Sequence, residues 1–234
     1  MKDGGVPDGG VPDGDKGAGR DRPAARGPAL RANDPENTRR NILDIASREF
    51  AEKGFTGARV DEIAARTETS KRMIYYYFGD KEGLFVAVLE EAYKSIRARE
   101  AELKLDHLSP EDAIRALVGF TFDFQNDNEQ FVRIVMTENI HYGAHLGSSR
   151  ILQDLNVSVI DTIRSIYSRG VAEGVFRPGI DEIDLHQTIS ALCIFNVSNR
   201  YTFSRIFKRD LTDPEVRARR RASVIETVVR SLKA

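Results

Sequence analysis

The segment RVDEIAARTETSKRMIYYYFGDK, residues 59–81, determines how the N-terminal part of the chain folds. Apolar residues recur on one face of residues 60–66 at helical spacing, which predicts a short helix there. A turn over residues 67–69 follows, and the hydroxyl of Ser70 can cap a second helix over residues 71–77. Two short helices around a three-residue turn form a helix-turn-helix, whose second helix can enter the major groove of DNA.

The second helix of this segment carries the groups that recognise nucleic acid. Ile74 and Phe78 lie four residues apart and can pack inward, while three consecutive tyrosines cannot all face a core because successive helical side chains point about 100° apart. Polar, cationic and aromatic groups that can reach phosphates or base edges are supplied by Thr69, Ser70, Lys71, Arg72, Tyr75, Tyr76 and Tyr77. The alternative is an ordinary helical hairpin with a solvated basic rim.

The run from Thr38 to about Leu89 resembles the DNA-binding domain of TetR-type (TetR/AcrR) transcriptional regulators. The matching pieces are RRNILDIASREFAEKGFTGARVDEIA and TSKRMIYYYFGDKEGLF, which hold a helix ending at Lys-Gly-Phe, a Thr-Ser-Lys opening, Tyr-x-Tyr-Phe and a following Lys. One residue departs from the family pattern, which often has Gly in the turn where this chain has Glu68. If Glu68 adopts a positive φ, the strain is roughly 1 kcal/mol, which puts the turn geometry and not the motif in question.

The resemblance implies an all-α protein with a three-helix helix-turn-helix domain followed by a larger helical domain that binds an effector and dimerises. We place an N-terminal extension at residues 1–34, the DNA-binding domain at residues 35–81 and the larger domain at residues 82–234. The extension begins with the repeat GGVPDGGVPDG, which cannot bury a core and predicts a disordered, solvated segment. Five basic residues over 16–31 leave open a second reading, an arm that reaches DNA phosphates or an adjacent minor groove.

Composition sets limits on the remaining function classes. The chain has 234 residues, a net charge of −1 and one cysteine, Cys193, so an internal disulfide is excluded and DNA attraction must come from local charge asymmetry. No apolar run is long enough to span a bilayer and no apolar export segment opens the chain. We therefore expect no membrane association, and the resemblance implies a cytoplasmic location.

Helix after helix is predicted outside the central segment, with no convincing alternating strand. A first helix starts near Pro35 and ends at Gly54, which suits a left-handed cap, and Ser109-Pro110 opens a later one. Turn residues separate the remaining helices, which we expect over residues 81–104, 110–126, 128–145, 149–173, 181–207 and 213–232.

The resemblance also implies partners and contacts. A homodimer formed through the helices over 181–207 and 213–232 would place two recognition helices on a near-palindromic double-stranded DNA operator. We assign base or groove contacts to Lys71, Arg72, Tyr75 and Tyr76, phosphate contacts to Thr69, Ser70, Tyr77 and Lys81, and a phosphate-backbone contact to Arg39, and we include Arg59 among the DNA-binding residues. For Arg39, an ordinary solvated charge is an equally good reading.

Two further sites can be sought in the larger domain. Aromatic walls with a few hydrogen-bonding groups suggest an effector pocket, for which the candidates are Phe120, Phe124, Phe131, His141, Tyr142, Asn196, Asn199 and Tyr201, although the phenylalanines suit a plain core. Glu138, His141 and His145 stand at positions i, i+3 and i+7 on one helical face of the helix expected over 128–145, so they could present metal ligands. A single Glu-x-x-His unit is less than a di-iron site needs, and packing or pocket lining is the preferred reading.

The sequence therefore favours a dimeric, ligand-responsive transcriptional regulator that acts as a repressor, with no cofactor and no enzymatic motif. Two alternatives stay open at this point. One is a helical metal-dependent enzyme that uses Glu138, His141 and His145, and the other is an architectural protein that binds DNA without sequence preference.

Overall fold

The computed structural model describes residues 34–233, and the residues it describes are helical apart from turns and one isolated bridge between Phe176 and Lys233. This confirms the all-α class. The chain divides into two units, residues 1–34 and 35–234, and the elements below belong to the second. The predicted disordered extension and its alternative role as a DNA-binding arm lie outside the described residues.

Four helices form the N-terminal part of the second unit: α1 (Pro35–Gly57), α2 (Val60–Arg66), α3 (Lys71–Phe78) and α4 (Lys81–Ala101). Pro35 occupies the first position of α1, where its missing amide hydrogen costs no helical hydrogen bond. The regular part of α1 ends at Gly54, whose φ of 69° and ψ of 176° kink the chain. The positive φ predicted for this glycine is thus present, although ψ lies far from the left-handed helical value.

Turn chemistry sets the angle between the short helices. Glu68 has a φ of 52°, so this chain places a non-glycine residue in the left-handed region of the helix-turn-helix turn. Gly79 has a φ of 81° and ends α3, after which the Asp80 carboxylate accepts a hydrogen bond of 2.8 Å from the amide of Gly83 and caps α4.

We call α1–α3 together with α4 as far as Leu89 the head. Its core is one apolar cluster that includes the fully buried side chains of Ile42, Phe50, Ile63, Ile74, Leu84 and Phe85. Ile134 and Leu152, from later helices, join the same cluster. Leu84, Phe85, Val88 and Leu89 of α4 belong to this core, so the first turns of α4 pack with the helix-turn-helix.

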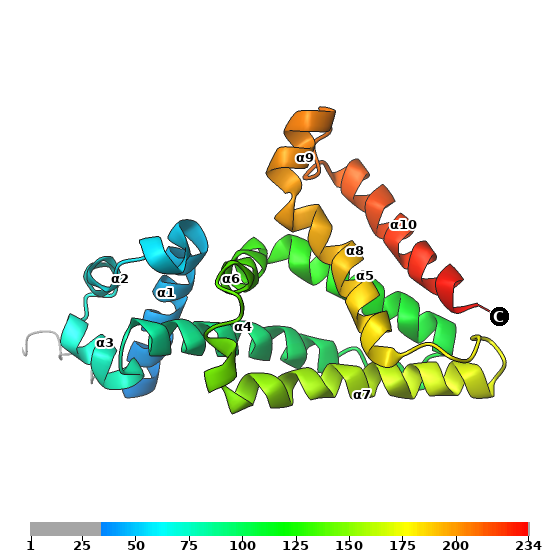
Figure 1. Cartoon of the computed structure of the whole chain (residues 1–234), viewed down its shortest axis with the longest axis horizontal. Helices are drawn as coiled ribbons and strands as arrows, with labels where there is room; N and C mark the ends of the chain where they lie inside the picture. The colour runs from blue at the N-terminus through cyan, green and yellow to red at the C-terminus, as the bar shows by residue number, and fades with distance from the viewer. Residues whose placement is uncertain (1–33, 234) are drawn as a thin grey trace, which may run out of the picture. The chain divides into compact units, whose positions relative to one another are not determined.

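The described residues after Leu89, which we call the body, contain the remainder of α4 and six further α-helices: α5 (Pro110–Asp127), α6 (Glu129–Ile140), α7 (Arg150–Ala172), α8 (Glu182–Ser198), α9 (Arg200–Phe207) and α10 (Pro214–Leu232). Short 3-10 turns precede α5 at Leu105–His107 and α7 at Leu146–Ser148. Helix α5 contacts α7, α8 and α10, as Figure 1 shows. The apolar residues of these helices form a second core, centred on Leu117, Phe122, Ile163, Ile189 and Val228.

Three helix boundaries differ from the sequence prediction. The helix expected over 128–145 ends at Ile140, because Tyr142 and Gly143 take positive φ values of 61° and 71°. The helix expected over 181–207 is broken at Asn199, whose φ of −105° and ψ of 5° separate α8 from α9. The helix expected to reach residue 104 stops at Ala101. The Ser109 cap is confirmed, since its hydroxyl accepts from the amide of Asp112 at 3.2 Å.

Candidate DNA-binding surface and effector cavity

Helix α3 is held in the head by two buried side chains. Ile74 is fully buried and Phe78 is 9% exposed, and both belong to the head core. The Ser70 hydroxyl accepts a hydrogen bond of 3.2 Å from the amide of Met73 and so caps the helix, as its sequence position predicts. These contacts fix which face of α3 remains outside.

The outer face of α3 presents a cation and two aromatic rings. Arg72 is exposed, and Tyr76, four residues on, is 78% exposed. Tyr75 is 36% exposed, whereas Tyr77 is half-buried and packs against the head core. A tyrosine ring left largely in water on a short capped helix is available for contact with a base or a sugar. Tyr75 and Tyr76 therefore face solvent, whereas Tyr77 packs against the head core.

Lys71 is already engaged within the head. Its ammonium lies 3.0 Å from the Asp61 carboxylate of α2, and the hydrogen bond to Asp61 raises the pKa of Lys71. Asp61 was not among the residues selected from the sequence. Its position ten residues before Lys71 gave no helical spacing by which to find it, since the turn lies between them.

The remaining predicted DNA contacts lie at the margins of α3. The Lys81 ammonium sits 5.0 Å from the centre of the Phe55 ring and donates to the carbonyl of Thr56 at 3.3 Å, and burial lowers the pKa of Lys81. The Arg39 guanidinium lies 5.4 Å from the centre of the Phe78 ring. Arg59 is exposed and occupies the N-cap of α2, and the Thr69 hydroxyl donates to the carbonyl of Thr67.

The body contains a cavity of about 210 Å³ between α4, α5, α6, α7 and α8. Its walls combine aliphatic side chains with hydrogen-bonding groups, and they include Tyr93, Ile96, Arg97, Glu100, Leu117, Thr121, Gln125, Phe131, Asn156, Ile163, His186 and Ser190. A largely apolar enclosure with a few polar groups is the usual form of a small-molecule site. The volume lies below the roughly 300–1,000 Å³ of common ligand pockets, so it suits a small molecule.

The charged groups of this cavity lie at one wall. The Arg97 guanidinium pairs with the Glu100 carboxylate, while the Nε atom of Arg97 and the Oε1 atom of Gln125 are buried and have no hydrogen-bond partner among the described residues. Burial raises the pKa of Glu100, and Arg97 opposes that shift. Burial, reinforced by Arg97, lowers the pKa of His186, which favours the neutral imidazole.

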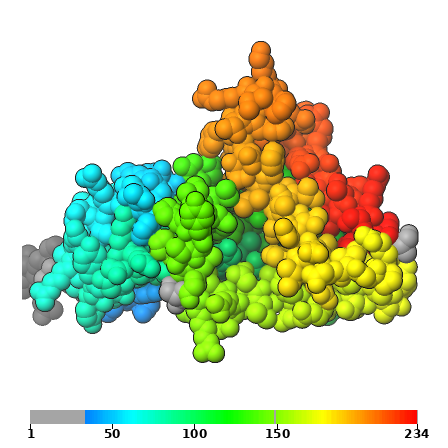
Figure 2. All heavy atoms as spheres, in the orientation of Figure 1, coloured from blue at the N-terminus to red at the C-terminus, as the bar shows by residue number. Residues whose placement is uncertain are grey.

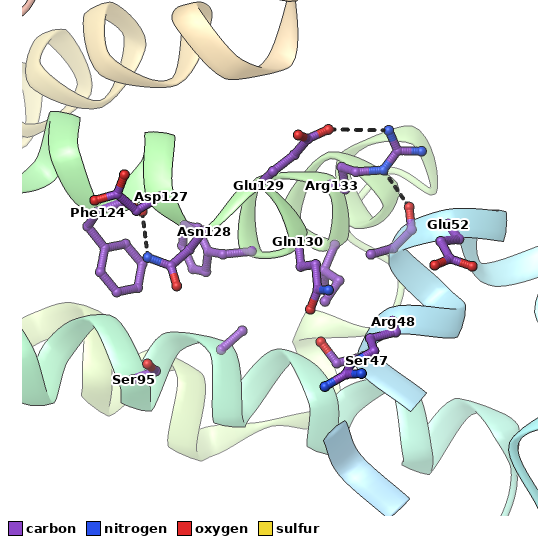
Figure 3. A pocket seen from close by; sticks show the side chains of 14 residues that line it. Ser47, Arg48, Glu52, Ser95, Phe124, Asp127, Asn128, Glu129, Gln130 and Arg133 are labelled. Carbon is purple, nitrogen blue, oxygen red and sulfur yellow. Dashed lines mark hydrogen bonds and ion pairs between the residues drawn. The ribbon is translucent and has the colours of Figure 1, made fainter. Parts of the chain in front are cut away.

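Few of the residues selected from the sequence as effector contacts lie at this cavity. Phe131 lines it. Phe124 and Phe131 together also border a more open groove of about 800 Å³ between α1, α4, α5 and α6, shown in Figure 3, and Phe120 packs on Phe124 at a ring separation of 5.8 Å. The structure does not bring the other candidates to the cavity: Tyr142 is 97% exposed, Asn196 bonds to Asn126, His141 contacts Phe55, and Asn199 and Tyr201 lie at the α8–α9 junction.

The residues of the possible metal site are arranged otherwise than the spacing suggested. Glu138 is the third-last residue of α6, His141 lies in the following turn, and His145 pairs with Glu138 through its Nδ1 atom at 2.7 Å. His141 directs its Nδ1 atom to the carbonyl of Thr137 and its Nε2 atom to the hydroxyl of Thr56. Within residues 34–233, no three histidine, cysteine or acidic side chains come together as metal ligands. The metal alternative therefore has no geometric support.

Comparison with known proteins identifies the family. A family model described as "Bacterial regulatory proteins, tetR family" matches residues 42–88, and one described as "Tetracyclin repressor-like, C-terminal domain" matches residues 110–228. The HTH-type transcriptional repressor NicS of Pseudomonas putida is 39% identical over 204 residues, which cover 87% of this chain and 96% of the relative. The chain belongs to the TetR family.

Solved structures of bacterial transcriptional regulators share the fold. A bacterial regulatory protein of the tetR family from Rhodococcus RHA1 superposes with a TM-score of 0.66 at 22% identity, over 84% of this chain and 97% of that one. The regulator FadR of Bacillus subtilis, solved in complex with stearoyl-CoA, gives a TM-score of 0.61 at 18% identity, over 81% of this chain and 97% of that one. As in the family, the helix-turn-helix is the DNA-binding element of a transcriptional regulator. Among the described residues, no helix is long and apolar enough to cross a membrane.

Proposed function

We propose that this TetR-family regulator is a repressor that binds its operator as a homodimer and releases it when a small molecule occupies the 210 Å³ cavity. The observation that carries the proposal is the outer face of α3, on which Arg72 and Tyr76 are exposed while Ile74 and Phe78 anchor the helix. The relationship to a repressor at 39% identity supports the direction of regulation.

The base contacts that we propose follow from the exposure of their side chains. Arg72, Tyr75 and Tyr76 reach base edges, and Lys71 joins them when DNA competes with Asp61 for its ammonium. Phosphate contacts come from the N-terminal ends of α3 and α4, where Thr69, Ser70 and Lys81 lie, together with Tyr77 and the flanking Arg39 and Arg59. Backbone contacts of this kind set the register of the helix in the groove, and the base contacts set the sequence.

Dimerisation is proposed from the apolar surface that α8 and α9 leave uncovered. Leu185, Ile189 and Cys193 of α8 are buried in the body, but Ile183 and Phe195 on the other side are 61% and 40% exposed. Figure 2 shows the orange segment that contains α9 projecting at the top of the view, and Ile206 and Phe207 of α9 are 70% and 63% exposed. A second copy would cover this surface, with the small exposed residues Ala218 and Ala222 allowing α10 to approach closely.

The effector response is proposed as a change in the spacing of the two heads. Helix α4 contributes both to the head core, through Leu84 and Val88, and to the cavity, through Tyr93 and Arg97. A ligand that binds more tightly to one position of α4 therefore shifts the two heads relative to each other. DNA affinity falls by at most the factor by which the ligand prefers that position of α4 over the position that binds DNA. Half-sites one helical turn apart, about 34–36 Å, tolerate little change in that spacing.

The experiment that tests the proposal has two stages. Bound duplexes are first selected from a random pool with the full-length protein, and the selected duplex is then used to screen small molecules that release it. We expect a near-palindromic consensus and at least one small molecule that lowers affinity about tenfold, a coupling of about 1.4 kcal/mol. If no preferred sequence were recovered, the protein would be an architectural protein that binds DNA without sequence preference, and the proposal would be wrong.

Lys81 is expected to contribute a phosphate contact. Lys81→Ala should weaken binding by a similar factor on all duplexes and reduce the slope of log K against log salt concentration by about one, because one fewer counterion is released. Binding to the selected duplex and to point variants of it, each at several salt concentrations, measures both quantities. Unequal losses across the duplex variants would instead show that Lys81 reads sequence.

Phe195 is expected to lie in the dimer interface. Phe195→Arg should convert the dimer to monomers at micromolar concentration, since it places a charge in a desolvated apolar patch already bordered by Arg209, Arg219 and Arg220. Operator affinity should fall by about 100-fold or more as the second half-site loses its tether. Sedimentation velocity reports the oligomeric state, and Gln153→Arg, an exposed position on α7, is the control. A dimeric Phe195→Arg protein would place the interface elsewhere.

A further inference from the structure

The turn between α6 and α7 is organised by one buried carboxylate. Glu138 is 1% exposed and accepts three hydrogen bonds: from the backbone amides of His145 and Leu146, at 2.8 and 3.0 Å, and at 2.7 Å from the Nδ1 atom of His145. Charge-assisted hydrogen bonds to a buried carboxylate are among the stronger ones in proteins. The path of residues 141–146 is therefore set by Glu138.

The two imidazoles of this turn lie against the head. His145 is 6% exposed, and its ring centre lies 4.4 Å from that of Phe55 and 5.2 Å from that of Phe85. His141 lies 5.6 Å from the Phe55 ring, and its Nε2 atom is 3.4 Å from the hydroxyl of Thr56. Both imidazoles thus contact the segment that leaves the kink of α1.

The same segment supports Lys81 from its other side. The Lys81 ammonium lies over the Phe55 ring and donates to the Thr56 carbonyl. Lys81 is the first residue of α4, and two residues separate it from the end of α3 at Phe78. A displacement of Phe55 therefore changes the support of Lys81 and of the corner that joins α3 to α4.

Two further contacts hold α6 and α7 against α1 and α4 around this turn. Arg133 of α6 donates from its Nε atom to the carbonyl of Ala51, in the last regular turn of α1, at 2.6 Å, as Figure 3 shows. Ser149, which caps α7, donates to the carboxylate of Glu90 in α4 at 2.6 Å. Glu138 lies between these two contacts in the sequence. Its charge also reaches the effector cavity, since it adds to the burial that raises the pKa of Tyr93.

We propose that Glu138 is a positioning residue for DNA binding: it holds His145, and the turn that includes His141, against Phe55, and so fixes Lys81 and α3 relative to the body. The proposal rests on the proposed DNA contacts of α3 and Lys81. It requires no metal at Glu138, His141 and His145, and it gives these three residues a common role that their spacing alone did not reveal.

Glu138→Gln tests the proposal, because glutamine keeps the shape and one acceptor oxygen but loses the charge and the second acceptor. The probe is the duplex selected with the wild-type protein, so specific binding by the wild type is established before the variant is measured. We expect the dissociation constant of the variant to rise about tenfold, within the range by which residues remote from a ligand alter its binding. Asn139→Ala, an exposed neighbour on α6, should bind like the wild type.

A spectroscopic readout separates positioning from a general loss of stability. The chain has four histidines, and the carbon-bound ring protons of His145 should be shifted by the rings of Phe55 and Phe85. In Glu138→Gln this resonance should move toward its position in an unstructured peptide, at a temperature where circular dichroism shows a folded protein. A folded variant whose His145 resonance moves while operator affinity stays at the wild-type value overturns the proposal, as does an unmoved resonance.

A second variant carries the test if Glu138→Gln does not fold. Phe55→Leu keeps an apolar side chain but removes the ring that contacts His145, His141 and Lys81. It should lose operator affinity by a similar factor, about tenfold. Where both variants fold, the operator affinity of the double variant should equal that of the single variant with the lower affinity, because both substitutions break the same chain of contacts. Wild-type affinity in Phe55→Leu, or full additivity of the two losses, contradicts the proposal.

Discussion

Replacing Arg72 by alanine should reduce affinity for the selected operator by about 10- to 100-fold and relax the sequence preference at one base-pair position in each half-site. The range corresponds to the roughly 1–3 kcal/mol that a good bidentate contact between an arginine and a base contributes. Arg72 is exposed on α3, and no carboxylate among the described residues pairs with it, whereas Lys71 is held by Asp61. The guanidinium can therefore reach DNA without first breaking an internal ion pair.

The measurement is a set of binding curves at one salt concentration, for the selected duplex and for duplexes changed at single positions. Specific loss should appear as equal affinities for all four bases at one position and preserved discrimination at the others. Arg150→Ala, which removes an exposed arginine at the start of α7, controls for the change in net charge. If Arg72→Ala weakened every duplex by the same factor, Arg72 would contact a phosphate and the base contacts would have to come from Tyr75 and Tyr76.

The helix-turn-helix could be predicted from the sequence because its determinants are local. The hydroxyl of Ser70 caps α3 by accepting from the amide of Met73, three residues on, and the buried Ile74 and Phe78 are one helical turn apart. Glu68 has the positive φ that the family's glycine at this position implies. Each of these interactions spans fewer than five residues. The sequence alone therefore contains the information that sets this part of the fold.

The cavity and the helix breaks could not be predicted in the same way, because they depend on tertiary contacts. Tyr93, Arg97 and Glu100 lie at spacings of four and three along α4, next to the apolar stripe that ends at Ile96. That spacing is a usable sequence signal for a polar wall, whereas the predicted effector contacts are mostly aromatic residues farther along the chain. The break at Asn199 has no glycine or proline to mark it.

The prediction of a shared helical face for Glu138, His141 and His145 was wrong for a related reason. The spacing of three and seven residues has meaning only while the helix continues, and α6 ends at Ile140. In the turn that follows, His145 folds back onto Glu138 and both groups become buried. The carboxylate satisfies the amides of its own turn, a local interaction that periodicity cannot express.

Gly83→Ala should disturb the corner between α3 and α4 and abolish specific DNA binding more completely than any single DNA-contacting substitution. A Cβ atom built on Gly83 would lie 2.1 Å from the carbonyl oxygen of Phe78, the last residue of α3. Because that oxygen belongs to the backbone, it can move only if α3 moves. In an unobstructed helix the same substitution would stabilise by up to about 1 kcal/mol, so any destabilisation measures the clash. We expect a net loss of about 1–3 kcal/mol.

Thermal unfolding and operator binding together test this expectation. For a chain of this length each kcal/mol corresponds to about 2–4 °C in melting temperature, and affinity for the selected duplex should fall by at least about 100-fold at temperatures where the variant is folded, since α3 then sits at a different angle to its base contacts. Gly57→Ala is the matched control, because its added Cβ atom would meet only the Cβ atom of Lys53 at 3.4 Å, an ordinary contact. A Gly83→Ala protein with wild-type affinity would mean that the α3–α4 corner adjusts without moving the outer face of α3. In that case a displacement of Phe55 and Lys81 at the same corner would not be expected to alter DNA binding either.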